Sequence, residues 1–433
     1  MRDARGRART SGRLNVNRRQ FVRLAGIGLG AASGLAGTVL TNAQTRGRTR
    51  ATADVVVVGA GVFGVWSAFH LRRKGASVIL VDAYGPGNSR SSSGGETRQV
   101  QVDHENPVYI RSGISAYDQW KSLEESCCTR LVLSTGKLTL STSEDLIDES
   151  DALVKRLKPF GVTNVEILRP DELRQRWPQI NSDDLAFGVY AGGGPSGSTL
   201  MARRCCEAVA REFEKLGGEL RIARCRPVFS AAGAMTGVEQ HDGETLSAGQ
   251  YVFACGPWLP NLFPEVLGKR LQVVRRDVLF YGSPPGDARF AYPNFPTWSV
   301  MGSGWYGFPD IEHRGFKAAP FPDYNSIDPD TDERLVSPMQ VKRGREFLRH
   351  RFPALGDMPI VETRVCQLTN SIDENFIVDR HPESDVVWLV GGGSGHGFKH
   401  GPTVGEFVAH SLLGETVDDE MATTFRLKPQ VFE

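Results

Sequence analysis

The sequence has little net charge and no internal repeat. Its 433 residues carry a formal net charge of only +1, and the length allows two domains with sizeable cores. The charge is uneven, because residues 1–43 hold eight arginines against the single acid Asp3 and so carry +7, which leaves −6 for the remainder. Since the body of the chain has no basic excess, we expect no nucleic-acid partner.

The cysteines are not spaced as in disulfide-bonded or zinc-binding proteins. The seven cysteines are an odd number, and the adjacent pairs Cys127–Cys128 and Cys205–Cys206 are poor candidates for disulfides. The sequence has no CxxC pair, and we find no Cys/His ligand spacing that predicts structural zinc. We therefore expect no metal.

Long hydrophobic runs are also missing. The best candidate, residues 24–40, is rich in Gly and Ala, and it is short and weakly apolar for a stable membrane span. It follows Arg18-Arg19-Gln20-Phe21, and a twin arginine before a mild apolar run resembles a Tat export signal. Small residues at 41–43 permit cleavage after Ala43. We expect residues 1–43 to be a twin-arginine signal peptide that directs a periplasmic or extracellular protein through the Tat export machinery; an arginine-rich tail and an uncleaved anchor are the alternatives.

The clearest pattern follows this leader. Four valines at 55–58 predict a buried parallel strand, and an amphipathic run at 65–73 predicts a helix. Between them, Gly59 would allow a tight turn, Gly61 would let a pyrophosphate approach the backbone, and Gly64 would let the helix pack close to the strand. The phosphates would then lie at the positive end of the helix.

A second predicted strand, residues 77–81, ends at Asp82. This acid stands about 20 residues after the glycines, where a carboxylate binds the ribose hydroxyls of a dinucleotide. The pattern predicts a dinucleotide site but does not separate FAD from NAD, and the acid argues against NADP.

The rest of the chain repeats the transition from a buried strand to glycine twice, at 250–256 and 386–393, while strands of antiparallel type fill the gaps. This pattern predicts a discontinuous nucleotide domain of Rossmann-like α/β type and an inserted α+β substrate domain built on an antiparallel sheet. The predicted nucleotide domain comprises residues 54–130, 195–270 and 365–420, and the substrate domain comprises 131–194 and 271–364. Helices are predicted at 107–125, 145–160, 170–177, 198–216, 337–351 and 403–413, and a hairpin between 219–223 and 237–241.

Five stretches together resemble the FAD-dependent amine oxidases of the D-amino-acid oxidase superfamily, most closely the monomeric sarcosine oxidase and N-methyltryptophan oxidase group. The resemblance covers nearly everything from Asp54 onward and implies FAD as the cofactor. The stretches are Gly59 to Gly64, Gly95-Glu96-Thr97-Arg98, Tyr306-Gly307-Phe308-Pro309 with Lys317, Cys366 to Pro382, and Ser394-Gly395-His396-Gly397-Phe398-Lys399.

The resemblance implies roles for individual residues. Cys366 would carry the flavin covalently through its sulfur, and Lys317 would stand over the flavin and stabilise superoxide as it forms. Tyr306 would line the substrate pocket, Lys399 would bind a substrate carboxylate, and Arg98 would lie on the other side of the flavin ring. A buried free thiol, a core tyrosine and surface cations are the alternatives. The implied cofactor-binding residues are Gly59, Gly61, Val62, Phe63, Gly64, Asp82, Thr97, Arg98, Cys366, Gly395, Gly397, Phe398 and Lys399.

Three positions depart from the family pattern. Gln101 stands where the family often has a second arginine, and Gly94 and Phe321 stand where sarcosine oxidases have histidines. Because these changes remove polar groups, they argue against sarcosine and favour a bulkier or more apolar N-substituted amine.

The reaction implied is oxidation of a secondary or primary amine to an imine, followed by hydrolysis, with oxygen reduced to hydrogen peroxide. FAD would carry the redox chemistry. No protein general base is evident, so we expect the neutral amine to react. The alternatives are a dehydrogenase that passes electrons to another carrier, a non-catalytic exported flavoprotein and, from the glycine motif alone, a nicotinamide enzyme. We expect a monomer whose partners are a small-molecule amine and molecular oxygen.

Overall fold

The computed structural model describes residues 50–321 and 325–429. The predicted signal peptide, residues 1–43, lies outside the described residues. No helix in the described ranges is long and apolar enough to cross a membrane.

The first sheet is parallel at its centre. β1 (Arg50–Val58) lies between β2 (Val78–Asp82) and β12 (Thr245–Phe253), and β12 also pairs in parallel with β19 (Ser384–Gly391). These strands come from the beginning, middle and end of the chain, so the predicted Rossmann-like, discontinuous α/β fold is confirmed. The sheet is completed, within the described residues, by β9 (Glu219–Ile222), β10 (Cys225–Phe229), β11 (Met235–Gln240) and β18 (Ile377–His381).

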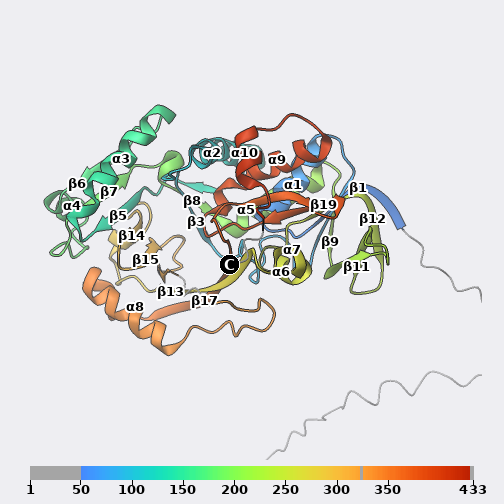
Figure 1. The fold of residues 1–433 in the computed structure, drawn as a ribbon. Helices are drawn as coiled ribbons and strands as arrows, with labels where there is room; N and C mark the ends of the chain where they lie inside the picture. Colours follow the sequence, from blue (N-terminus) through green and yellow to red (C-terminus); the bar gives the residue numbers. More distant parts are fainter. Residues whose placement is uncertain (1–49, 322–324, 430–433) are drawn as a thin grey trace, which may run out of the picture. The chain divides into compact units, whose positions relative to one another are not determined.

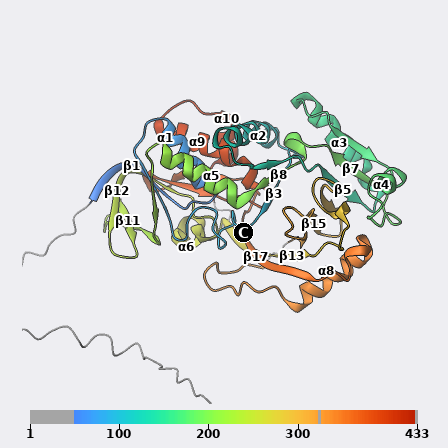
Figure 2. The same cartoon turned by 180° about the vertical axis from the view of Figure 1, so that it is seen from behind.

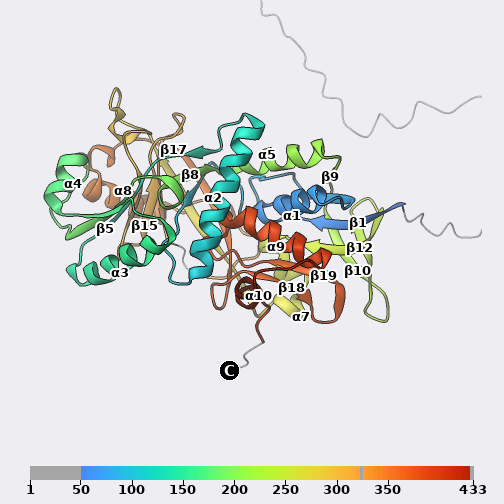
Figure 3. The same cartoon turned by 90° about the horizontal axis from the view of Figure 1, so that it is seen from above.

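Helices cover one face of this sheet. α1 (Val62–Arg73) packs against α5 (Ala202–Lys215) and α9 (Gly401–Leu413), and α2 (Pro107–Cys127) lies over α9 (Figure 3). Their apolar side chains form one core with the sheet. α10 (Asp419–Phe425) packs on α2 and β18, and the short α6 (Leu259–Leu262) and α7 (Pro264–Leu267) contribute to the core on the other face.

One local prediction is wrong in this region. Residues 198–201, predicted as the first turn of a helix, form β8 (Ser198–Met201), and the helix begins only at Ala202. All four β8 residues are buried, and β8 pairs with β3 (Thr97–Val100) and β4 (Val132–Leu133), so tertiary pairing overrides the helical pattern. The hairpin predicted between 219–223 and 237–241 is present as β10 and β11, while β9 pairs in parallel with β2.

The second sheet is antiparallel except where β14 meets β5, which confirms the predicted antiparallel substrate sheet. α8 (Pro338–Arg351) packs on two of its strands, β13 and β16. Figures 1 and 2 show this sheet, with α8, on the other side of the molecule from β1 and β12. Its strands in order are β17 (Ile360–Ser371), β13 (Leu271–Tyr281), β16 (Phe316–Pro320), β15 (Trp305–Phe308), β14 (Thr297–Val300), β5 (Lys137–Ser141), β7 (Phe187–Ala191) and β6 (Val165–Leu168). α3 (Ile147–Leu157) and α4 (Pro170–Arg176) lie beside β6 and β7.

The described residues form one compact unit, so the division of the chain into a nucleotide and a substrate domain stays a prediction. The long strand β17 crosses the predicted boundary at residue 365. It pairs with β13 along its length and therefore places Cys366 in the second sheet.

Candidate active site

A large cavity lies at the carboxyl ends of the central parallel strands, where open α/β sheets bind their ligands. It has an empty volume of about 1340 Å³, the open mouth included. The ends of four strands line it, namely Val58-Gly59, Val81-Asp82, Ala254-Cys255 and Val390-Gly391. Predicted cofactor residues Gly59, Gly61, Val62, Phe63, Asp82, Arg98, Gly395, Gly397 and Phe398 also line it.

The glycine turn is shaped so that no side chain fits. Gly59 has φ +103°, and a Cβ there would lie 2.5 Å from the carbonyl oxygen of Ala254. A Cβ on Gly64 would lie 1.8 Å from the Gly59 carbonyl oxygen, which is why α1 can approach β1 so closely. At the start of α1, the N–H of Val62 donates to Ser93 Oγ at 2.9 Å.

The Asp82 carboxylate secures the turn after β2. Its Oδ2 accepts from the N–H of Ala60 (2.7 Å), and its Oδ1 accepts from the N–H groups of Tyr84 and Gly85. Burial raises the pKa of Asp82, and these hydrogen bonds oppose the rise. The carboxylate therefore joins the glycine turn to the next loop and borders the cavity; its contact with a ribose stays a prediction.

Unpaired polar groups on the cavity wall fit a polar cofactor. Ser92 Oγ and Thr369 Oγ1 are buried, belong to residues that line the cavity, and have no hydrogen-bond partner among the described residues. Such groups are normally paired. Together with the glycine cradle and the helix N-terminus, they suit the hydroxyls and phosphates of a dinucleotide.

Arg98 lies at the wall of the cavity with its guanidinium fixed in place. It donates to the backbone carbonyls of Thr97 (2.8 Å), Ser92 (2.5 Å) and Gly94 (2.6 Å), and it stands 5.8 Å from the ring centre of Phe398. All three acceptors are backbone oxygens, so none of these hydrogen bonds brings in a carboxylate that would neutralise the charge of Arg98. The cavity therefore has a positive group at this point.

Lys317, on β16, is a second cation near this wall. Its side chain is 5% exposed, and Nζ donates to Thr97 Oγ1 at 3.1 Å and lies 4.6 Å from the ring centre of Phe308. Burial, followed by the charge of Arg98, lowers the pKa of Lys317 to about 7. Lys317 also lines a second cavity of about 700 Å³ empty volume together with Glu96 and Arg314.

The same face of the second sheet carries Tyr306 and Cys366. These residues pack in one small cluster with Phe280. The Tyr306 hydroxyl accepts from Arg276 (3.2 Å), whose guanidinium stands 5.1 Å from the centre of the Tyr306 ring. Arg276 is directly opposite Cys366 in the strand register.

Lys399 lies apart from both cavity linings, although the preceding Gly397 and Phe398 border the larger one. It is 2% exposed, and its ammonium donates to the carbonyl of His396 at 3.3 Å. Burial lowers the pKa of Lys399 to about 7, although the Asp103 carboxylate opposes the shift. A contact between Lys399 and a substrate carboxylate stays a prediction.

Sequence reasoning missed Arg276 and Ser93. Arg276 lies in strand β13 beside the charged residues Arg275 and Asp277, so the sequence pattern does not single it out as a site residue. Ser93 lies in a glycine- and serine-rich loop, and nothing in that loop marks one serine as the partner of the helix N-terminus.

The cavity, the glycine cradle and the cations Arg98 and Lys317 are typical of a dinucleotide-dependent oxidoreductase. The chain belongs to the FAD dependent oxidoreductase family (DAO), whose family model matches residues 54–411, and it is therefore an FAD-dependent oxidoreductase.

Among its relatives, monomeric sarcosine oxidase of Bacillus sp. (strain B-0618) is 28% identical over 376 residues, covering 84% of this chain and 94% of the relative. N-methyl-L-tryptophan oxidase of Salmonella dublin is 27% identical over 397 residues, covering 86% and 98%. The structure of fructosyl peptide oxidase from E. terrenum matches the fold with a TM-score of 0.76 at 22% identity, covering 89% of this chain and 94% of that one.

Proposed function

We propose that this protein is an amine oxidase acting on N-substituted amino acids or similar amines. The carbon–hydrogen bond next to nitrogen breaks, the imine formed is hydrolysed by one water, and one oxygen molecule is reduced to hydrogen peroxide. Bound FAD would accept the electron pair from the amine and pass it to oxygen. The observation that carries the proposal is the buried Lys317 ammonium, held by Thr97 and close to Arg98 at the cavity wall.

The protein's own groups supply charge and orientation. Arg98 and Lys317 would stabilise the negative charge that develops during reduction, and the burial of Lys317 would strengthen its interaction. The same charges disfavour a cationic amine, so the neutral amine is expected to bind. The second cavity, lined by Lys317, gives a small molecule such as oxygen a path to this ammonium.

The substrate side is the face with Tyr306, Arg276 and Phe321. Phe321 is half exposed and stacks on Tyr306 with ring centres 6.0 Å apart, and Arg276 stands 5.8 Å from its ring centre. An aromatic wall with one cation suits an amine that carries an apolar group and a carboxylate. The named substrate of the Salmonella relative has that chemistry.

Attachment of FAD through the Cys366 sulfur belongs to this proposal. Leu368 and Thr369, on the same strand, line the large cavity, and the Cys366 thiol is free and half buried. Denaturing precipitation of wild-type protein should leave yellow colour in the pellet and an added cofactor mass on the chain, and both should be lost in Cys366→Ser. Colour that leaves with the supernatant in wild type would refute covalent attachment while retaining a flavoenzyme.

The activity is tested with a panel of amines that includes sarcosine, N-methyl-L-tryptophan and an N-alkyl amine without a carboxylate. We expect flavin bleaching without oxygen, and one peroxide per substrate in air. Bleaching with slow peroxide release and fast reduction of an artificial quinone would establish a dehydrogenase instead. Absence of bleaching with every amine would refute amine oxidation.

We also propose export through the Tat machinery as a monomer, on the basis of the leader at 1–43. The double variant Arg18→Lys/Arg19→Lys should keep the protein in the cytoplasm, while wild type reaches the periplasm or medium. Export of the variant at wild-type level would contradict this route.

A further inference from the structure

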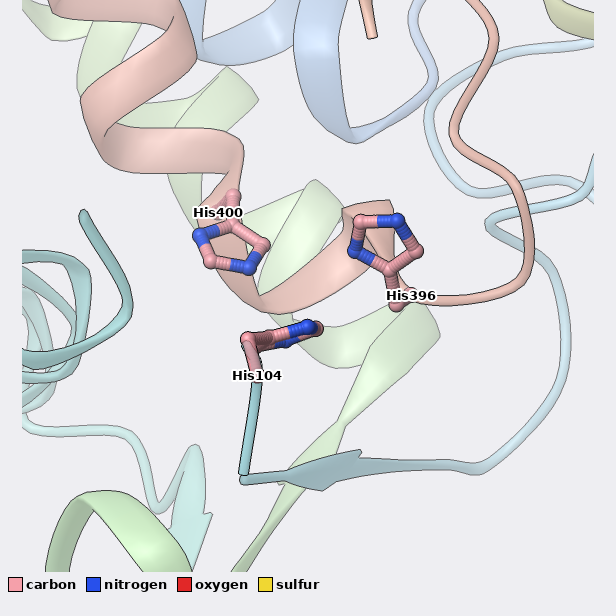
Figure 4. Close-up of side chains that lie close together, drawn as sticks. All are labelled: His104, His396 and His400. Carbon is pink, nitrogen blue, oxygen red and sulfur yellow. The ribbon is translucent and has the colours of Figure 1, made fainter. Parts of the chain in front are cut away.

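Three histidines gather beside the segment that precedes α9. His104 comes from the loop before α2, whereas His396 and His400 come from the turn η7 (Gly397–His400) and the residue before it. Figure 4 shows the three rings around a common space. The ring centres are 5.0 Å apart for His104 and His396, 5.8 Å for His104 and His400, and 6.0 Å for His396 and His400. One ring nitrogen from each lies within 4.8 Å of the other two.

Each ring has a nitrogen without a partner. His104 Nε2, His396 Nδ1 and His400 Nε2 are buried and make no hydrogen bond to any described residue. His400 is 0% exposed. Three unpaired buried nitrogens in one place are unusual, since buried polar atoms normally find partners.

Hydrogen bonds determine where the proton sits on His400. Thr403 Oγ1 donates its only proton to the His400 carbonyl (3.1 Å), so it must accept from Ser112 Oγ at 2.7 Å. The Ser112 proton is then used, and Ser112 Oγ must accept from His400 Nδ1 at 2.9 Å. The proton of neutral His400 is therefore on Nδ1, which leaves a lone pair on the unpaired Nε2.

The same argument applies to His396. Its Nε2 lies 3.1 Å from the carbonyl oxygen of Glu374, and a carbonyl only accepts. Nε2 therefore carries the proton, and the unpaired Nδ1 carries the lone pair. An outer hydrogen bond that fixes the tautomer and directs the lone pair inward is the arrangement typical of metal-binding histidines.

We infer that His104, His396 and His400 bind a divalent transition-metal ion of the zinc class, with a water or anion in the fourth position. A tetrahedral ion with bonds of about 2.0 Å separates its ligand nitrogens by about 3.3 Å, so the rings must close by up to about 1.5 Å from the 4.8 Å bound. His104 and His396 are only partly buried, which leaves room for this adjustment and a route for the ion.

The ion would join two parts of the chain that are far apart in sequence. It would tie the loop before α2 to the turn that carries Gly397 and Phe398, two residues of the large cavity wall. The ammonium of Lys399 is turned to the His396 carbonyl, and its charge weakens binding of a cation. We therefore expect a site that chelators can empty, with a role in holding the turn rather than in the redox step.

The test uses flavin-loaded protein without a histidine tag, stripped with EDTA, dialysed, and titrated with Zn²⁺ or Co²⁺. Elemental analysis should find about one ion per chain, bound Co²⁺ should give the visible bands of a tetrahedral nitrogen site, and the midpoint of thermal unfolding should rise with metal. His104→Gln and His396→Gln should each weaken binding at least about tenfold. His410→Gln, which changes a partly buried histidine on α9 outside the cluster, should bind as wild type.

The flavin spectrum and circular dichroism check that the variants fold. If the variants do not fold, the cobalt spectrum of the wild-type protein still tests the site. The site would be overturned if wild-type protein took up no ion or gave an octahedral, water-like cobalt spectrum. It would also be overturned if His410→Gln weakened binding as much as His104→Gln and His396→Gln do.

Discussion

Lys317 and Lys399 are buried to a similar degree but lie in different surroundings. Both lysines are almost fully buried, and burial lowers the pKa of each to about 7. Lys317 borders a cavity, contacts the Phe308 ring and donates to the Thr97 hydroxyl. Lys399 borders neither cavity and lies by a carbonyl, the Asp103 carboxylate and three histidines. Similar burial therefore yields one cation open to incoming molecules and one built into the wall.

The strongest test of this difference removes the charge at Lys317. In Lys317→Met we expect the rate constant for oxygen consumption by substrate-reduced enzyme to fall about 10²–10³-fold, as for loss of a preorganised charge. The rate of anaerobic reduction by amine should change by less than about tenfold. Stopped-flow measurement of both half-reactions checks this. Lys342→Met, on the exposed face of α8, is the control, and an unchanged oxygen rate in Lys317→Met would contradict the assignment.

Lys399→Met should give the reverse pattern. The predicted contact with a substrate carboxylate is a charge-assisted hydrogen bond of about 1.5–3 kcal/mol, so its loss should raise KM for a carboxylate substrate roughly 10- to 150-fold. The oxygen rate constant should stay near wild type. An amine without a carboxylate provides the control. An equal rise of KM for both substrates would assign Lys399 to the wall alone.

The wall around Lys399 should also contribute to stability. Asp103 forms an ion pair with Lys137, and their side chains are 25% and 11% exposed. Burial would raise the pKa of Asp103, but Lys137 and other cations lower it to about 2. Because the pair is only partly buried, Asp103→Asn should reduce the free energy of unfolding by about 1–3 kcal/mol. Denaturant titration of the holoenzyme measures this, and an unchanged midpoint would show that the pair is neutral for stability.

The cofactor end of the fold was predictable because its signals are local. The strand, glycine turn and helix at 55–73 occur in the predicted order, as β1 and α1, since each pattern lies within one continuous stretch. The residues of the second sheet face are different. Arg276 and Cys366 are brought opposite each other by strand register, which no single segment encodes, and only the family resemblance pointed to Cys366.

The histidine cluster is a second feature that depends on tertiary packing. His396 and His400 stand four residues apart, which brings two side chains together on a helical turn, but two histidines alone do not predict a metal site. His104 is almost three hundred residues earlier in the sequence, and only tertiary packing brings it to them. Lys317 and Thr97 stand 220 residues apart in the sequence, and tertiary packing likewise brings them within hydrogen-bond distance.

The finest test concerns pH and the Thr97 hydroxyl. A lysine whose pKa is lowered to about 7 is charged below that pH and loses its proton as the pH rises through it, so the oxygen rate constant should fall at high pH. A bound anionic group can only move this midpoint upward.

The hydrogen bond from Lys317 to the Thr97 hydroxyl favours the charged form of the lysine, and Thr97→Val removes its acceptor. The midpoint should therefore move to lower pH by less than about one unit in this variant. Stopped-flow oxygen kinetics from pH 6 to 10 (roughly one unit below to three above the lowered pKa) measure the shift, with Thr199→Val, a buried threonine that pairs with Thr135 instead, as control. A shift to higher pH in Thr97→Val would mean that the hydroxyl does not stabilise the ammonium. The difference between the surroundings of Lys317 and Lys399 would then consist only in the cavity that Lys317 borders.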